Sequence, residues 1–172
     1  MFTMVKNLLI LRHATSATQG TDGQDFTRPL TAKGVQEASI QGRFLKEAGI
    51  LPSHIGSSSA DRARQTTESL AQSLGVSMVP RFHDELYNAA GMEILEVVQR
   101  IPEDNDTALV VAHLPGVAEL LDILTTDFQE ISVAFAPATM AGVSFKDLSR
   151  WADIRPGTGM LEWLLPPFLL QD

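Results

Sequence analysis

The sequence contains no cysteine among its 172 residues. This absence excludes a disulfide framework, a zinc site built on thiolates, an iron–sulfur cluster and every enzyme with a cysteine nucleophile. The glycine-rich phosphate loops GxxxxGK[ST] and GxGxxG are missing, and so is the GxSxG elbow of many serine hydrolases. The four histidines, at positions 13, 54, 83 and 113, form no closely spaced ligand pair, so we expect neither a metal site nor a cofactor.

Long hydrophobic runs and an excess of positive charge are missing as well. The longest apolar run near the start, Leu8–Leu11, is far shorter than a signal-peptide core or a membrane span, and Met160–Leu170 is interrupted by Glu162 and two prolines. With 13 Lys and Arg against 21 Asp and Glu, the net charge is −8, which argues against nucleic-acid binding. We therefore expect a cytoplasmic protein that binds neither nucleic acid nor a membrane.

The composition is that of an ordinary globular protein, with 44% hydrophobic and 20% charged residues. A chain of this size buries roughly 70% of its unfolded surface and needs no covalent staples. No repeat, low-complexity tract or charge block divides the sequence. We therefore expect residues 1–172 to form a single domain.

Strand-like and helix-like segments alternate along most of the chain. Two apolar runs, Val5–Leu11 and Thr107–Ala112, predict strands that are buried on both faces. Shorter strands are expected at His54–Ser58, Met78–Phe82, Thr139–Phe145 and Gly159–Leu165, the last two as antiparallel neighbours at a sheet edge. Helices are expected after an N-cap at Thr31, after a cap at Ser59, at Gly91–Ile101 and from Pro115 onward. This alternation predicts an α/β sandwich with a mainly parallel sheet.

Three polar clusters follow apolar runs directly: Arg12-His13, Ser58–Arg62 and His113. Ligands of open α/β sheets bind outside the carboxyl ends of the strands, so these clusters are expected to converge on one rim. Two arginines and two histidines there would make a compact cationic site within an acidic protein. A phosphoryl group suits such a site, because arginine pairs with two phosphate oxygens and a neutral imidazole is a competent phosphoryl nucleophile.

Five ordered motifs are spread from about Val5 to Pro166. They are Leu11-Arg12-His13-Ala14, Arg28-Pro29-Leu30-Thr31 with Gly34, Ser58 to Thr66 (SSADRARQT), Ala112-His113-Leu114-Pro115-Gly116, and Trp151-Ala152-Asp153-Ile154 with Pro156-Gly157. These motifs resemble those of the histidine phosphatase superfamily, and the similarity is greatest to its small phosphohistidine-phosphatase branch, the SixA type.

The resemblance implies a three-layer, phosphoglycerate mutase-like fold, with a mixed, mostly parallel sheet flanked by helices on both faces. It implies that His13 is the nucleophile and that Arg12, Arg62 and His113 bind the phosphoryl oxygens, with no metal or cofactor. Arg28 is expected to be a further substrate contact. Arg64 is left out, because two residues beyond Arg62 on a helix it points elsewhere.

The general acid is the part of the family pattern that this sequence does not supply plainly. Larger relatives carry a Glu or Asp on an inserted segment, and Glu85 is the one candidate here. Because imidazole leaves more easily than an alkoxide, a missing acid favours phosphohistidine as substrate. We therefore predict a metal-independent phosphatase that acts on a phosphorylated protein, with phosphate ion as product. The alternatives are a phosphomonoesterase acting on a small phosphorylated metabolite and a catalytically silent module that binds phosphate or a phosphoprotein.

Overall fold

The protein is built on a six-stranded sheet with the strand order β3-β2-β4-β1-β5-β6. The structure, a computed structural model, describes residues 5–125 and 134–170. The strands are β1 (Val5–Arg12), β2 (His54–Ser58), β3 (Arg81–His83), β4 (Thr107–Ala112), β5 (Met140–Lys146) and β6 (Met160–Leu165). The first four are parallel, whereas β5 runs antiparallel to β1 and β6 antiparallel to β5. The prediction of a mixed, mostly parallel sheet with an antiparallel edge is confirmed.

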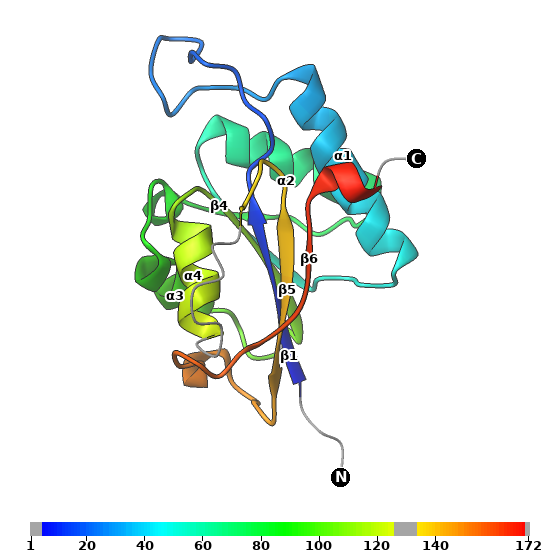
Figure 1. Cartoon of the computed structure of the whole chain (residues 1–172), viewed down its shortest axis with the longest axis vertical. Helices are drawn as coiled ribbons and strands as arrows, with labels where there is room; N and C mark the ends of the chain where they lie inside the picture. The colour runs from blue at the N-terminus through cyan, green and yellow to red at the C-terminus, as the bar shows by residue number, and fades with distance from the viewer. Residues whose placement is uncertain (1–4, 126–133, 171–172) are drawn as a thin grey trace.

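Helices cover both faces of the sheet (Figure 1). The helices α1 (Ala32–Glu47) and α2 (Asp61–Leu74) pack on one face, and α3 (Gly91–Val98) and α4 (Gly116–Leu124) pack on the other. Three short 3-10 turns complete the described elements: η1 (Asp84–Leu86), η2 (Trp151–Asp153) and η3 (Pro167–Leu170). The expected three-layer architecture, with helices on both faces of the sheet, is therefore confirmed. No helix of the described ranges has the length and apolar content that a membrane crossing requires.

The two apolar runs form the centre of the sheet, and both cores contact them. In β1, Leu8 and Ile10 face the side of α3 and α4, while Leu9 and Leu11 face the side of α1 and α2. All four side chains are buried, which is why the run is continuously apolar instead of alternating. Strands β1 and β4 pair in register up to Arg12 opposite Ala112. The residues that follow these two strands are therefore placed side by side at the carboxyl edge of the sheet.

Some element boundaries differ from the prediction. Thr31 does cap α1, since its hydroxyl accepts a hydrogen bond from Gly34 N at 3.1 Å. The N-cap of α2 is Ala60 and not Ser59, because the Ser59 hydroxyl is hydrogen-bonded to Asp84 instead. Strand β3 starts only at Arg81, after Pro80, which has no N–H to give to a sheet.

Helix α3 is also shorter than predicted and ends at Val98 instead of Ile101. The amides of Arg100 and Ile101 bond to carbonyls three residues back, at 3.2 and 3.1 Å. This is the tighter 3-10 pattern that often closes a helix. Ile101 is still buried, so its predicted inward position is confirmed although the helix has ended.

Candidate active site

The sheet brings His13, His113 and Arg62 together at its carboxyl edge. His13 directly follows β1, and its amide continues the pairing with β4 by donating to Ala112 O at 3.0 Å. The imidazole rings of His13 and His113 lie 5.1 Å apart between centroids. Arg62, from the first turn of α2, donates its Nε–H to His13 Nε2 at 3.3 Å. All three side chains are buried, so the expected convergence of three chain segments on one rim is present in the structure.

The His13 ring is held with one nitrogen facing the backbone and the other facing Arg62. Its Nδ1 lies 2.8 Å from Ala14 O. A carbonyl oxygen can only accept, so the proton is on Nδ1 and the lone pair is on Nε2. Burial lowers the pKa of His13 to about 4; the hydrogen bond to Ala14 O opposes this shift, and the positive charges of Arg62, Arg12 and Arg28 add to it. At neutral pH His13 is therefore an uncharged imidazole whose Nε2 electron pair accepts the hydrogen bond from Arg62.

His113 is held from the neighbouring strand β2. Its Nε2 lies 2.8 Å from the hydroxyl of Ser58, the last residue of that strand. Burial lowers the pKa of His113 to about 3, with smaller contributions from His13 and Arg62. This ring is also uncharged at neutral pH, and its hydrogen-bond partner Ser58 belongs to the polar cluster Ser58–Arg62 of the sequence analysis.

Arg12 approaches the same rim from the last position of β1. Its Nη1 donates to Phe135 O at 2.7 Å, in the segment that leads into β5. Its Nε is buried without a hydrogen-bond partner among the described residues, and the same is true of His113 Nδ1. Buried polar atoms nearly always have partners, so two orphans in one cluster point to a ligand that supplies acceptor or donor atoms there.

A second layer of contacts comes from the loop between β1 and α1. Arg28 donates to Asp25 Oδ1 at 2.7 Å, to Ser16 Oγ at 2.9 Å and to Ala17 O at 2.7 Å. Asp25 also accepts from Arg62 and from the Tyr87 hydroxyl. The structure thus connects Arg28 to the cluster through Asp25, and its expected contact with substrate stays a prediction.

Asp25 and Tyr87 are residues that the sequence analysis missed. Asp25 precedes Arg28 by three positions within a polar loop, a spacing too common to single it out. Tyr87 is the only tyrosine of the chain, yet nothing in its neighbourhood indicates that η1 turns it toward α2. The contacts of Asp25 and Tyr87 with Arg62 form only when segments far apart in the sequence pack together.

Glu85 is placed differently from the expectation that it serves as a general acid. Its carboxylate forms an ion pair with Arg100 and lies 3.8 Å from His83 Nδ1. The η1 turn buries Leu86 and leaves Glu85 exposed. None of the contacts of Glu85 in the described ranges is with the His13 cluster, so this placement does not favour an acid role.

Other motif residues hold the segment after His13 in place. Ala14 N donates to the Thr66 hydroxyl at 3.0 Å, and Thr15 N donates to the Glu37 carboxylate at 2.9 Å. Gly34 lets α1 approach so closely that a Cβ at this position would lie 2.0 Å from Thr15 O. Arg64, which was left out of the predicted site, lies over the Phe82 ring at 4.0 Å.

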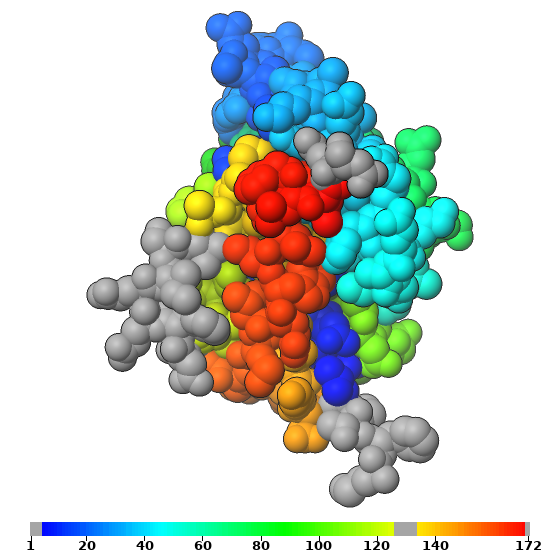
Figure 2. All heavy atoms as spheres, turned by 45° about the vertical axis from the view of Figure 1, so that its right-hand side comes forward, coloured from blue at the N-terminus to red at the C-terminus, as the bar shows by residue number. Residues whose placement is uncertain are grey.

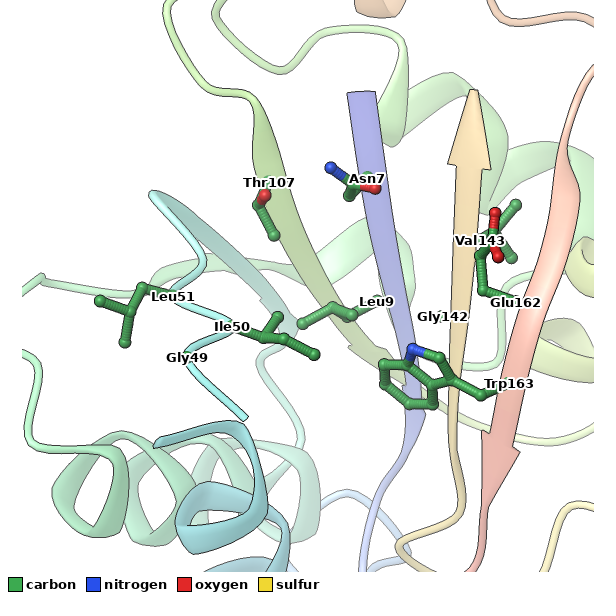
Figure 3. Close-up of a pocket in the computed structure, with 10 residues that line it drawn as sticks. All are labelled: Asn7, Leu9, Gly49, Ile50, Leu51, Thr107, Gly142, Val143, Glu162 and Trp163. Atoms are coloured by element: carbon green, nitrogen blue, oxygen red, sulfur yellow. The ribbon is translucent and has the colours of Figure 1, made fainter. Parts of the chain in front are cut away.

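Grouped metal ligands and cavities are the other features that could mark a site. Within residues 5–125 and 134–170, no three His, Asp or Glu side chains are grouped as metal ligands would be. A cavity of about 370 Å³ lies beside Asn7, Leu9, Ile50, Thr107 and Trp163 (Figure 3). Asn7 and Thr107 are at the starts of β1 and β4, so this cavity is at the opposite end of the sheet from His13, about 20 Å along the strand. Figure 2 shows the start of β1, in dark blue, at the surface of this end of the molecule.

Comparison with protein families gives one match that covers more than half of the chain. The family described as "Histidine phosphatase superfamily (branch 1)" matches residues 8–109. An uncharacterized protein of Mycobacterium tuberculosis is 33% identical over 159 residues, which cover 88% of this chain and 96% of the relative. An uncharacterized chloroplastic protein of Arabidopsis thaliana is 28% identical over 172 residues, covering 94% of this chain and 78% of the relative.

Solved structures of similar fold cover nearly the whole chain. The protein histidine phosphatase SixA complexed with tungstate superposes with a TM-score of 0.81 at 24% identity, covering 96% of this chain and 99% of SixA. A putative phosphohistidine phosphatase SixA from Nakamurella multipartitia superposes with a TM-score of 0.76 at 30% identity, covering 94% and 95%. A phosphoglycerate mutase from Bacillus anthracis superposes with a TM-score of 0.67 at 16% identity, covering 98% and 96%.

Proposed function

Because the chain belongs to the histidine phosphatase superfamily and to its SixA-type branch, we propose that it removes the phosphoryl group from phosphohistidine in a protein. Family membership identifies a phosphatase. The substrate class, the roles of the individual residues and the independence from metal are the proposal. In this proposal His13 takes the phosphoryl group, and Arg12, Arg62 and His113 bind its oxygens. Phosphate ion is the product.

The observation that carries the proposal is the state of His13 Nε2. This atom is unprotonated, because the ring's proton is held on Nδ1 by Ala14 O, and it faces the Nε–H of Arg62 at 3.3 Å. A phosphoryl group bonded to Nε2 would therefore lie against a guanidinium that can neutralise its equatorial oxygens. Phosphoryl transfer depends mainly on such positioning and charge stabilisation.

The reaction proceeds in two displacements. The Nε2 electron pair attacks phosphorus in line, a bond forms between Nε2 and phosphorus, and the bond from phosphorus to the substrate's imidazole nitrogen breaks. The substrate's ring, protonated on its other nitrogen, keeps the electron pair of that bond and departs as neutral imidazole. Water then attacks the phosphorylated His13, its proton passes to solvent or phosphate, and Nε2 regains its electron pair.

The contacts of the carboxylates near His13 support the proposed substrate class. Among the described residues, Asp25 is the one carboxylate hydrogen-bonded to a member of the cluster or to Arg28. The Tyr87 hydroxyl, Arg28 and Arg62 hold the pKa of Asp25 well below its usual range, so it stays ionised and has no proton to give. A leaving group that departs without a carboxylic acid fits this arrangement, and imidazole is such a group whereas an alkoxide is not.

Phosphate release tests the proposal directly. Wild type and His13→Ala are compared, in excess chelator, on a protein that carries phosphohistidine and on an aryl phosphate. We expect rapid release from phosphohistidine, slower release from the aryl phosphate and none above background with His13→Ala.

Two other results would contradict parts of the proposal. Loss of activity in chelator would contradict metal independence, and a preference for small phosphate esters would contradict the substrate class. Saturable binding of the phosphoprotein without release by the wild type would instead favour a silent binding module.

A further inference from the structure

Asp25 lies at the centre of a group of contacts that the mechanism above does not use. It belongs to the loop between β1 and α1, which extends beyond the carboxyl end of β1 (Figure 1). Its carboxylate accepts from Arg28 at 2.7 Å, from Arg62 at 3.0 Å and from the Tyr87 hydroxyl at 2.7 Å. Its backbone oxygen accepts a further bond from Arg62 at 2.8 Å.

These contacts fix the two terminal nitrogens of the Arg62 guanidinium, while its Nε–H faces His13. Both terminal nitrogens donate to Asp25, Nη1 to its backbone oxygen and Nη2 to its carboxylate, while Nε donates to His13. A guanidinium has five N–H groups, so one on each terminal nitrogen remains for a ligand. Asp25 therefore fixes the plane of Arg62 without using up the donors that a phosphoryl group needs.

Asp25 is itself fixed from two sides. Arg28 is anchored on Ser16 and Ala17, and it donates to one carboxylate oxygen. Tyr87 donates to the other carboxylate oxygen, which also accepts from Arg62. The Tyr87 ring meets the His113 ring edge-on, with 5.7 Å between centroids, and lies 5.8 Å from the guanidinium carbon of Arg62. Tyr87 thus links the carboxylate to the second histidine of the cluster.

The carboxylate also sets the charge of the site. Arg12, Arg28 and Arg62 contribute three positive charges and Asp25 one negative charge, while His13 and His113 are neutral at pH 7. These residues leave an excess of positive charge around His13, which suits a phosphoryl dianion. Without Asp25 the site would hold a larger positive charge and a less constrained Arg62.

We propose that Asp25, supported by the Tyr87 hydroxyl, is a positioning residue that aligns Arg62 for phosphoryl transfer to His13. It does not touch the phosphoryl group. This inference rests on the function proposed above and adds a requirement to it: binding of phosphate and turnover depend on different properties of Arg62. Binding depends on its charge, and turnover depends on its orientation.

The variant Asp25→Asn separates these two properties. It removes the negative charge and weakens the bonds to Arg62 and Arg28, while the side chain keeps its size. We expect kcat to fall about 10- to 100-fold, as for other residues that orient a catalytic group. The inhibition constant for inorganic phosphate is expected to stay the same or to become smaller, because the site becomes more positive.

One further variant serves as a control, and a second removes part of the contact with Asp25. Asp22→Asn makes the same charge change in the same loop, and an Asn there keeps an acceptor for Thr27 and for Gln24 N. We expect its kcat and phosphate inhibition to equal those of the wild type. Tyr87→Phe removes only the hydroxyl and is expected to lower kcat by a smaller factor than Asp25→Asn, again with unchanged phosphate inhibition. Unchanged kcat in Asp25→Asn, or equal losses of kcat and phosphate affinity, would overturn the proposal.

A spectroscopic experiment tests the contact without any activity. Tyr87 is the only tyrosine, so 3-fluorotyrosine incorporation gives one fluorine NMR signal from the site. The hydrogen bond to Asp25 raises the pKa of Tyr87 above its ordinary value, so the fluorinated ring should titrate at lower pH in Asp25→Asn than in the wild type or Asp22→Asn. Identical titrations in all three proteins would contradict the contact.

The two experiments also distinguish failure of this inference from failure of the proposed function. If the wild type releases no phosphate, the proposed function fails, while the fluorine titration and phosphate binding still report on Asp25 and Arg62. If the wild type is active and Asp25→Asn equals it, only the positioning role fails.

Discussion

Arg62 donates its Nε–H to His13 Nε2 at 3.3 Å, which joins residues 49 positions apart in the sequence. The contact exists because α2 starts directly after β2 and β1 ends at the same edge of the sheet. It gives the proposed nucleophile a cation on the side from which a phosphoryl group would approach.

The first prediction concerns the shape of the Arg62 side chain. Arg62→Lys keeps the charge but loses the Nε–H donor and both bonds to Asp25. We expect kcat/KM on phosphohistidine to fall on the order of 10²- to 10³-fold, as when one preorganised donor is removed from a reacting oxyanion. Steady-state kinetics of phosphate release provide the measurement, with Arg64→Lys as the matched control on the same helix. Equal activity of the two variants would remove Arg62 from the mechanism.

A second prediction is that the fold loses stability on mild acidification. The folded-state pKa values of His13 and His113 are lowered to about 4 and about 3, while an unfolded histidine titrates near 6.5. Between these values the unfolded chain binds protons that the folded chain does not bind, so stability falls as the pH drops below about 6.5. We expect the free energy of unfolding to fall by on the order of 1 kcal/mol per histidine between pH 6.5 and 5.5.

Urea unfolding at the two pH values measures this loss. In the variant His113→Asn, the free energy of unfolding should depend less on pH, because the contribution of His113 is removed. A stability that does not change over this pH range would show that the two rings are not buried in the neutral form.

The third prediction concerns Glu85, the residue that the sequence offered as a general acid. Its carboxylate is exposed and paired with Arg100, and exposed ion pairs contribute about 0–1 kcal/mol. We expect Glu85→Gln to change kcat less than about 2-fold on both phosphohistidine and aryl phosphate and to leave Tm nearly unchanged. A selective loss of activity on the aryl phosphate would instead return Glu85 to the role of acid.

The fourth prediction concerns Gly34, the glycine of the motif around Arg28. A methyl group there would meet Thr15 O at 2.0 Å, and this backbone cannot move without shifting the segment after His13. We expect Gly34→Ala to destabilise the protein by about 1–3 kcal/mol and to lower activity as well. Gly56→Ala is the control, because a Cβ there has no neighbour closer than 3.7 Å. Equal unfolding midpoints for the two variants would contradict the close approach.

The sequence predicted the parts of the fold that depend on long buried runs. Strand β4 has the predicted bounds and β1 extends one residue further than predicted, because a run of apolar residues between polar flanks leaves few alternatives. The positions of Arg12, His13 and His113 followed from those strand ends. The short strand β2 also has the predicted bounds. Strand β3 starts later than predicted, because it is held by only three pairs with β2 and local preference did not determine where it starts.

The surroundings of Arg62 could not be predicted from the sequence. Asp25 and Tyr87 lie 62 positions apart, in a loop and after a short turn, and they meet only when both segments pack over α2. Residue type alone led to the wrong acidic residue. Glu85 and Asp25 are both acidic, but in the structure Glu85 forms an exposed ion pair with Arg100, whereas Asp25 contacts Arg62.

The most direct test of the account is to trap the covalent intermediate. The protein is mixed with a substrate protein carrying radiolabelled phosphohistidine, quenched in alkali within the first turnover and mapped by mass spectrometry. The account predicts a phosphoryl group on His13 that is stable in base and labile in acid, and no label on the His13→Ala variant. Label on another residue, or turnover by His13→Ala at the wild-type rate, would contradict it.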